Sequence, residues 1–273
     1  MHRIACIIAA ALMVILSTPL EAEALSFESV VSPSERTAIV TGTLSLPPGP
    51  GPFPVVVLMH PCGGLDRFGV ATLKAHAKNL QTAGFGAFIL DSFGPRNLGG
   101  GKACGMETSR FRKDDAFNAM AFLARNPKVS KDNLFALGLS SGGSAAIEIA
   151  KGKAEARFRA VAAYYPECHS FGPNVAIQSP LLIFVAGKDD WTLPDGCLRA
   201  KNINWVAGAT FDVVDYPNAR HGFDQQRDRP ATYRGHTLAY SPDATADSRR
   251  RVIDFFLRHL TDDLKTKMQK GRN

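Results

Sequence analysis

The sequence predicts an α/β protein with a mostly parallel, doubly wound sheet and helices on both of its faces. Short apolar runs rich in β-branched residues recur along the chain, at residues 52–60, 86–93, 133–139, 158–166, 180–187 and 210–217. Segments with helical periodicity alternate with them, at residues 71–84, 113–127, 141–152, 193–205 and 243–260. Strands that are apolar throughout belong in a parallel sheet covered on both faces, and helices between them supply the crossovers.

The limits of these elements are marked by turn residues. Prolines precede the first core strand, 52–60, and the loop Pro61-Cys62-Gly63-Gly64 follows it. The helix at 71–84 stops at a glycine, and Pro127 ends the helix that begins at Lys113. Two weaker strands are expected before the core, at residues 29–31 and 37–46. In such sheets, ligands bind beyond the carboxyl ends of the strands.

The first 24 residues have the features of a secretory signal peptide. A short basic start, 1–3, precedes an apolar run at 4–16 that is too short to span a bilayer comfortably. Small residues stand at Ala22 and Ala24, where a signal peptidase reads the chain. We expect cleavage after Ala24 and export to the periplasm or medium, leaving residues 25–273 as a single domain. The alternative is an uncleaved N-terminal anchor.

Composition and charge favour an ordinary globular protein over a nucleic-acid binder. The chain is 45% hydrophobic and 21% charged, with a formal net charge of +7. Its basic residues are scattered except at 249–251 and in the tail 265–273, and no basic stripe interleaved with aromatic residues appears. We interpret these two clusters as a solvated helix face and a frayed terminus. No membrane association is expected after signal cleavage.

A candidate nucleophile lies in the segment Gly138-Leu139-Ser140-Ser141-Gly142, which follows a predicted strand and begins a predicted helix. This G-x-S-x-G pattern is typical of a sharp turn that exposes its central serine, here Ser140. The backbone N–H of Ser141, at the helix N-terminus, is then expected to help stabilise an oxyanion. A tight turn merely capped by serine is the alternative.

A serine nucleophile needs a base and an acid that orients the base, and both follow in the expected order. Asp189 and Asp190 stand where the strand at 180–187 ends, and His221 follows the last strand. We predict His221 as the base, in preference to His236 and His169. Of the two aspartates we predict Asp190 as the acid, with Asp189 as a surface or turn residue.

These motifs resemble those of the dienelactone hydrolase family, which has the α/β-hydrolase fold. The resemblance covers most of the chain after residue 24 and includes HPCGG, DSFGPR, GLSSGG, YYP, GKDDWTLP and YPNARHGFD. In that family the triad acid precedes the proline by four residues, which implies Asp190, and the family histidine corresponds to His221. The founding members have cysteine where this chain has Ser140, which favours a general esterase over an enzyme for dienelactone itself.

The resemblance also implies roles for the four cysteines after residue 24. Loops that follow neighbouring strands of this fold hold Cys62 and Cys104, and likewise Cys168 and Cys197, so we predict these two disulfides. The backbone N–H of Cys62 is expected to be the second oxyanion donor, because Pro61 has none. A metal site is the alternative for the cysteines, but no Cys-x-x-Cys or histidine pair supports one. No cofactor is expected.

The sequence therefore predicts an exported serine hydrolase that cleaves small-molecule carboxylic esters or lactones through an acyl-enzyme on Ser140. A peptidase or acyltransferase with the same triad is one alternative. A non-catalytic lactone- or carbohydrate-binding protein of the same fold is another, although such a protein has no need of the whole triad.

Overall fold

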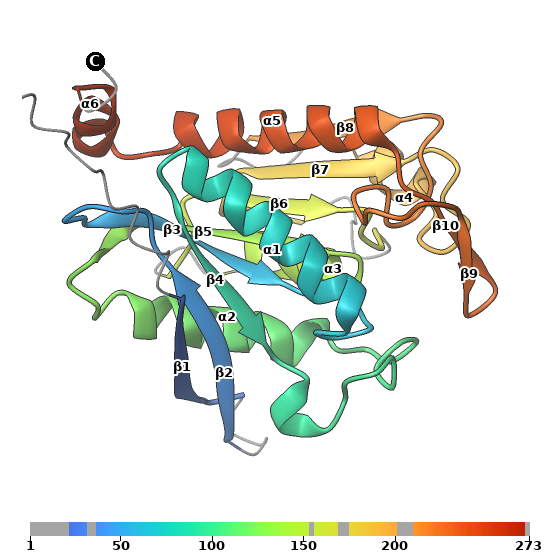
Figure 1. Ribbon diagram of the computed structural model, residues 1–273, viewed down its shortest axis with the longest axis horizontal. Coiled ribbons are helices and arrows are strands. Elements are labelled where there is room, and N and C mark those ends of the chain that lie inside the picture. Colours follow the sequence, from blue (N-terminus) through green and yellow to red (C-terminus); the bar gives the residue numbers. More distant parts are fainter. Residues whose placement is uncertain (1–21, 32–36, 153–155, 169–174, 201–209, 271–273) are drawn as a thin grey trace, which may run out of the picture.

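The computed structural model describes residues 22–31, 37–152, 156–168, 175–200 and 210–270. Its centre is an eight-stranded sheet with helices on both faces (Figure 1). The strands are β1 (Ala22–Ser29), β2 (Ala38–Ser45), β3 (Phe53–Met59), β4 (Gly86–Asp91), β5 (Val129–Leu139), β6 (Val161–Tyr164), β7 (Leu181–Ala186) and β8 (Phe211–Tyr216). Their order across the sheet is β1-β2-β4-β3-β5-β6-β7-β8. The β1–β2 and β2–β4 pairings are antiparallel and the others are parallel, as the sequence predicts.

Helices cover the sheet as two separate layers. They are α1 (Arg67–Thr82), the short 3-10 helix η1 (Gly94–Arg96), α2 (Ser109–Leu123), α3 (Ser141–Ala150), α4 (Asp195–Ala200), α5 (Pro242–Arg258) and α6 (Asp262–Lys270). Apolar residues of α2 and α3 share one core with Val55 and Val57, whereas those of α1, α5 and α6 share the other with Val56 and Leu58. Alternate residues of β3 thus face opposite cores, which explains why this strand is apolar along its whole length.

The structure corrects two expectations for the less apolar parts of the chain and adds one element that was not expected. Strand β1 lies at Ala22–Ser29 rather than at 29–31, and most of its residues are exposed, so hydropathy located it poorly. The tail is not frayed up to Lys270, because α6 places Leu264 against the core. A small hairpin of β9 (Ala231–Tyr233) and β10 (His236–Leu238) was not expected at all.

Some expectations fall partly outside the described residues. These are most of the signal peptide, the second half of the helix predicted at 193–205, and the last three residues of the tail. Cleavage after Ala24 would remove the first residues of β1, which pair with Thr43–Ser45 of β2. In the part of the chain that the structure describes, no helix is both long and apolar enough to cross a bilayer.

The carboxyl ends of the parallel strands meet at one edge of the sheet. β3 leads to His60, β5 to Ser140, β7 to Asp189, and β8 to the segment that holds His221. The hairpin β9–β10 lies at the same end of the molecule (Figure 1). Residues far apart in the sequence are thereby brought to a single site.

Candidate active site

A strained turn between β5 and α3 presents Ser140. This residue has φ 54° and ψ −119°, a backbone conformation that side-chain-bearing residues rarely adopt. Close packing permits only glycine on either side: a Cβ at Gly138 would overlap the carbonyl of Gly142, and one at Gly142 would lie 2.6 Å from the carbonyl oxygen of His60. The N–H of Ser140 donates to the carbonyl of Tyr164 at 2.9 Å, which fixes the turn to β6.

Ser140, His221 and Asp189 form a continuous chain of hydrogen bonds. The hydroxyl of Ser140 lies 2.9 Å from Nε2 of His221, and Nδ1 of His221 lies 2.8 Å from Oδ2 of Asp189. All three side chains are buried at the strand ends, with residue exposures of 5%, 2% and 4%. This arrangement allows the imidazole to accept the serine proton while the carboxylate holds the other ring nitrogen.

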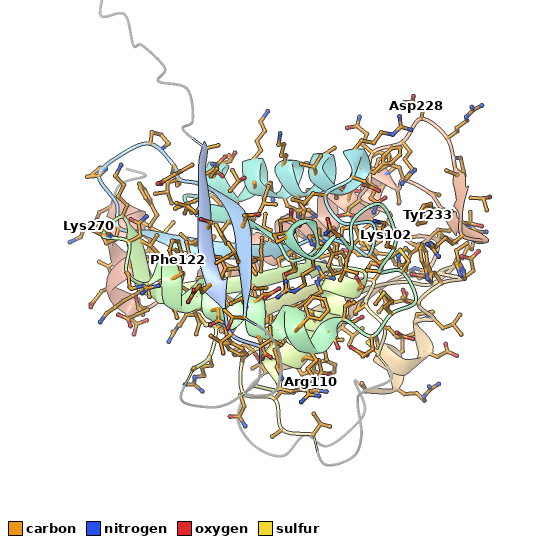
Figure 2. The ribbon with its side chains drawn as sticks, turned by 90° about the horizontal axis from the view of Figure 1, so that it is seen from below. Lys102, Arg110, Phe122, Asp228, Tyr233 and Lys270 are labelled. Atoms are coloured by element: carbon orange, nitrogen blue, oxygen red, sulfur yellow. A yellow bond between two sulfur atoms is a disulfide. The ribbon has the colours of Figure 1, made fainter. Side chains whose placement is uncertain are left out.

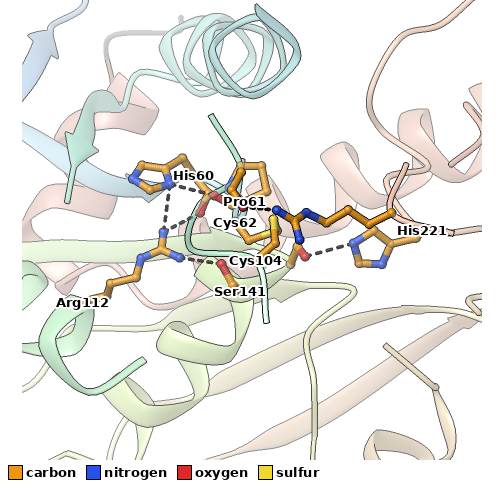
Figure 3. Close-up of a disulfide and its surroundings, with 10 residues drawn as sticks. His60, Pro61, Cys62, Cys104, Arg112, Ser141 and His221 are labelled. Atoms are coloured by element: carbon orange, nitrogen blue, oxygen red, sulfur yellow. Dashed lines mark hydrogen bonds between the residues drawn. A yellow bond between two sulfur atoms is a disulfide. The ribbon is translucent and has the colours of Figure 1, made fainter. Parts of the chain in front are cut away.

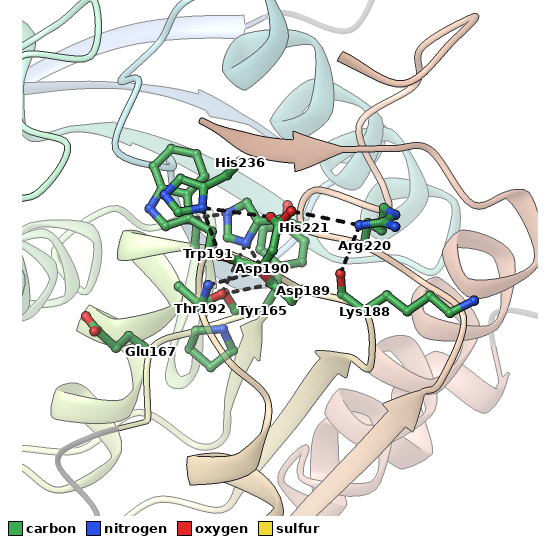
Figure 4. Close-up of polar contacts among 12 residues, drawn as sticks. Tyr165, Glu167, Lys188, Asp189, Asp190, Trp191, Thr192, Arg220, His221 and His236 are labelled. Atoms are coloured by element: carbon green, nitrogen blue, oxygen red, sulfur yellow. Dashed lines mark hydrogen bonds and ion pairs between the residues drawn. The ribbon is translucent and has the colours of Figure 1, made fainter. Parts of the chain in front are cut away.

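Asp189 is held in place by the turn that follows it. Its Oδ1 accepts the backbone N–H groups of Trp191 and Thr192 at 2.8 and 2.9 Å, which directs the carboxylate back toward the interior (Figure 4). The hydroxyl of Thr192 lies 2.9 Å from Oδ2 of Asp189, 3.1 Å from Nδ1 of His221 and 3.0 Å from the carbonyl of Tyr165. Thr192 is a site residue that the sequence analysis missed, because nothing in a lone threonine signals this contact.

The expectation that Asp190 orients the histidine is contradicted by this geometry. The Asp190 carboxylate turns the opposite way and accepts the backbone N–H of Thr237 in β10 at 3.0 and 3.2 Å. Its side chain is 43% exposed, and Arg220 lies 3.8 Å from it. Burial is the largest single influence and raises the pKa of this carboxyl, but the contacts with Thr237 and the nearby His236 and Arg220 together lower it. Asp190 thus links the hairpin β9–β10 to the turn that holds Asp189.

His236, one of the two alternative bases, is not in contact with Ser140 or Asp189. His236 stacks on Trp191 with ring centroids 4.8 Å apart, and its Nδ1 lies 2.8 Å from the carbonyl of Asp190 (Figure 4). Trp191 in turn lies 5.0 Å from the ring of His221, so its indole separates the two histidines. His169 lies outside the described residues.

A second buried network supports the loop of His221. The imidazole of His76, on α1, lies 2.6 Å from Oδ2 of Asp224, and the hydroxyl of Tyr165 donates to Oδ1 of Asp224 at 2.6 Å. Burial alone would raise the pKa of the Asp224 carboxyl, but the hydrogen bonds from His76 and Tyr165 hold it below its ordinary value. The network ties the segment three residues beyond His221 to α1.

Both predicted disulfides are present, joining Cys62 to Cys104 and Cys168 to Cys197. The first connects the loop after β3 with the glycine-rich loop before α2. The glycine-rich loop also contacts the hairpin, since Arg234 donates to the carbonyl of Gly101 at 2.7 Å. Figure 2 shows Lys102 and Tyr233 at this same end of the molecule.

The start of α3 packs against the loop after β3, as an oxyanion hole formed by Ser141 and Cys62 would require. Gly142 approaches the carbonyls at the end of β3 closely, and Cys62 is nearly buried there. The assignment of these two N–H groups as donors stays a prediction.

A buried arginine that the sequence analysis did not single out lies behind these two segments. Arg112, on α2, donates to the hydroxyl of Ser141 at 2.8 Å and also to the carbonyl of His60 (Figure 3). His60 itself is fully buried. Burial, followed by the nearby guanidinium of Arg112, lowers the pKa of its imidazole well below the ordinary 6.5. Within the described ranges, no group of three or more histidine, cysteine or acidic residues is placed to hold a metal.

Comparison with known proteins agrees with this geometry. The model of the dienelactone hydrolase family matches residues 40–260. Human mitochondrial acyl-coenzyme A thioesterase 2 is 33% identical over 115 residues, 42% of this chain but only about a fifth (21%) of that protein.

Solved structures share the fold of this chain, and two of them serve as examples. A dienelactone hydrolase from Anabaena variabilis has a TM-score of 0.62 at 18% identity, over 88% of this chain and 99% of its own. A lidless α/β serine hydrolase from Xanthomonas campestris has a TM-score of 0.58 at 14% identity, over 88% and 95%.

Proposed function

Because the chain belongs to the dienelactone hydrolase family, we propose that it is an exported serine hydrolase that cleaves carboxylic esters or lactones through an acyl-enzyme on Ser140. The observation that carries this proposal is the unbroken contact from the Ser140 hydroxyl through His221 to Asp189, at 2.9 and 2.8 Å. The three side chains are buried together beyond the carboxyl ends of the strands, and the strained turn holds the hydroxyl of Ser140 against His221.

The first half of the reaction transfers the acyl group to the enzyme. Oγ of Ser140 attacks the ester carbonyl carbon while Nε2 of His221 takes the hydroxyl proton. Asp189 accepts the Nδ1 hydrogen bond and stabilises the imidazolium that forms. When the tetrahedral intermediate collapses, the imidazolium returns the proton to the departing alkoxide oxygen. An ester releases its alcohol at this point, whereas in a lactone the new hydroxyl remains attached to the acyl chain.

The second half repeats these steps with water as the nucleophile. His221 takes a proton from the water as its oxygen attacks the acyl carbon, and then returns that proton to Oγ of Ser140 as the acid leaves. The carbonyl oxygen is negative in both tetrahedral intermediates. The N–H groups of Ser141 and Cys62 are the donors we propose for it, each contributing about 3–4 kcal/mol in related hydrolases.

Two features support export. The first is the signal-like sequence of residues 1–24, with small residues at its end. The second is the pair of disulfides, since such bonds persist mainly in oxidising compartments. N-terminal sequencing of the protein recovered from a secreting host tests this point: a start at Leu25 is expected, and an intact Met1 in the cytosolic fraction would contradict it.

The test of the activity compares the protein with Ser140→Ala on p-nitrophenyl acetate. We expect turnover by the parent chain and loss of at least about 10³-fold in the variant, because the nucleophile is gone. A fluorophosphonate should add one covalent phosphonyl group to the parent chain, located on Ser140 by peptide mass spectrometry. Activity that survives in Ser140→Ala would overturn the assignment, and an inert parent that resists the fluorophosphonate would favour a binding protein.

A thioester substrate is the second candidate, and the match to a human acyl-coenzyme A thioesterase favours it. The same triad cleaves a thioester by the same steps, with a thiolate as the leaving group. Release of free thiol from short acyl thioesters, measured beside the oxygen ester of the same acid, decides between the two. A higher kcat/KM for the thioester would replace the ester in our proposal.

A further inference from the structure

A fully buried cation lies behind the serine turn, and the triad mechanism makes no use of it. Arg112 has no solvent exposure, and its guanidinium packs 4.8 Å from the ring centroid of Phe93. One terminal nitrogen donates to the hydroxyl of Ser141 at 2.8 Å, and the other donates to the carbonyl of His60. Both partners belong to the segments that carry the proposed oxyanion donors, as Figure 3 shows.

The charge of Arg112 is not matched by a carboxylate of its own. The buried acidic residue on α2 is Asp115, whose two oxygens accept hydrogen bonds from the terminal nitrogens of Arg96, both at 2.9 Å. Among the described residues Arg112 forms no ion pair, and its Nε has no hydrogen-bond partner. Arg96 thus binds the buried carboxylate of Asp115, and Arg112 holds its charge beside the serine turn without a salt bridge of its own.

Such an arrangement lowers the stability of the folded protein, so a role in the reaction would explain why it is present. Burial lowers the pKa of Arg112 to about 9, while Asp115 and Asp91 act to raise it, so the group remains a cation at neutral pH. A buried charge without a direct ionic partner opposes folding. The hydrogen bonds to a carbonyl and a hydroxyl engage its two terminal nitrogens but do not neutralise its charge.

We infer that Arg112 is a positioning residue for the oxyanion hole: it joins the His60 and Ser141 segments and holds a positive charge behind them. This inference rests on the proposed function. The carbonyl that Arg112 holds belongs to His60, two residues before Cys62, and the hydroxyl belongs to the residue directly after the nucleophile. Both proposed donors are thus oriented from behind by one rigid, planar group.

The charge adds to this effect as the reaction proceeds. The substrate carbonyl is neutral in the ground state, but its oxygen becomes negative in the transition state, so a fixed cation in a dry site favours the latter. His60 does not supply this charge, because the low pKa of its imidazole keeps the ring neutral at pH 7. Removing Arg112 should therefore lower kcat far more than it changes KM.

A purely structural role for Arg112 would be to anchor α2, and the chain offers a matched control for it. Asn118, on the same helix, donates to the backbone carbonyl of Val30 at 3.2 Å and to the hydroxyl of Ser29 at 3.3 Å. Asn118→Ala loosens α2 without touching the His60 or Ser141 segments. This variant should lower the melting temperature and leave kcat per active site unchanged.

The experiment compares Arg112→Met, Arg112→Lys and Asn118→Ala on p-nitrophenyl acetate, with active sites counted by exhaustive fluorophosphonate labelling. For Arg112→Met we expect kcat per labelled site to fall about 10²-fold, as when an oxyanion donor is lost, with KM within about threefold. The Ki of a boronic acid, which forms an anionic tetrahedral adduct on serine, should rise in parallel. Arg112→Lys should recover about a tenth of the parent rate, because it keeps the charge but not the planar fork.

Two results would overturn this inference while leaving the proposed function intact. One is an Arg112→Met kcat per labelled site within about threefold of the parent; the other is a fall in kcat with no change in the boronic acid Ki. If Arg112→Met does not fold, Ser141→Ala and Arg112→Lys provide the test. A parent-like kcat and a parent-like boronic acid Ki in both variants would then overturn the inference. Failure of the proposed function itself appears separately, as activity that persists in Ser140→Ala.

Discussion

The two sides of the site differ in the sign of the buried charged group that lies next to the reacting residues. On the side of the serine turn and the Cys62 loop, Arg112 is fully buried and donates to the hydroxyl of Ser141, while Arg96 binds the buried carboxylate of Asp115. On the side of the histidine loop, Asp189 and Asp224 are both buried and accept hydrogen bonds from imidazoles, hydroxyls and backbone N–H groups. One side is therefore suited to a new anion, and the other to a new cation.

This difference matches the charge separation that ester cleavage creates. In the proposed mechanism, attack by Ser140 places a negative charge on the substrate oxygen and a positive charge on His221. A protein interior polarised beforehand stabilises both charges without having to reorganise during the reaction. The contrast can be tested by removing one contact at a time from either side.

The largest loss of kcat is expected when Asp189 is replaced, and a much smaller loss is expected for its neighbour Asp190. Asp189→Asn should lower kcat by about 10⁴-fold, because the amide no longer holds the reactive tautomer of His221. Asp190→Asn should change kcat by less than about threefold, since its carboxylate only binds the hairpin. Steady-state kinetics on one ester, with site counts, measures both. A larger loss in Asp190→Asn than in Asp189→Asn would restore the assignment that the sequence suggested.

The next effect concerns stability rather than rate. Asp224→Asn breaks the buried contact to His76 and should lower the free energy of unfolding by about 3–5 kcal/mol. The pKa of Asp224 is lowered by folding, so its contribution is fully present above the ordinary value of 3.8 and is lost as the pH falls through and below that value. Urea unfolding of both proteins from pH 7 to pH 3 should show the difference shrinking in acid.

A partly exposed carboxylate provides the control for this measurement. Asp247 binds Arg250 and Arg251 on the surface of α5, and its pKa is also lowered overall. Asp247→Asn should cost no more than about 1 kcal/mol, because solvent screens such pairs. Equal losses in the two variants would show that burial of the Asp224 network does not set its strength.

The smallest effect is expected from Thr192→Val, which keeps the shape of the side chain and removes its hydroxyl. The contacts to Asp189 and to the carbonyl of Tyr165 are lost, so stability should fall by about 0.5–1.5 kcal/mol. Because the Asp189–His221 bond remains, kcat should fall only several-fold. Thermal unfolding and steady-state kinetics measure the two quantities, and a loss near that of Asp189→Asn would show that Thr192 rather than Asp189 orients the ring.

The sequence could predict those features that depend on regular patterns. The core strands β3 to β8 and their parallel order follow from apolar runs separated by helices, and Ser140 and His221 follow from motifs at strand ends. The two disulfides follow from the order of strands that the family resemblance implies. The strands, the motif residues and the disulfides can all be predicted because they depend on the order and the limits of whole strands and helices, not on the direction of one side chain.

The features that were missed depend on where single side chains point. Asp189 and Asp190 are adjacent and chemically identical. They differ only in their partners in the fold: the backbone N–H of Trp191 donates to Oδ1 of Asp189, whose carboxylate points inward, whereas the Asp190 carboxylate accepts from the hairpin. Arg112 lies just before the helix expected from Lys113, and hydropathy assigns any arginine to solvent. Strand β1 is a mostly exposed edge, so its apolar pattern is weak.

The bridge between Cys62 and Cys104 has a consequence for the maturation of the enzyme. Cys62 belongs to the loop that we expect to bind the oxyanion, and its partner lies in the loop that meets the hairpin. A newly made chain in a reducing compartment lacks this covalent tie, which forms only where thiols are oxidised. An exported chain would thus gain the covalent link between the Cys62 loop and the glycine-rich loop only after crossing the membrane, as one of the later steps of its maturation.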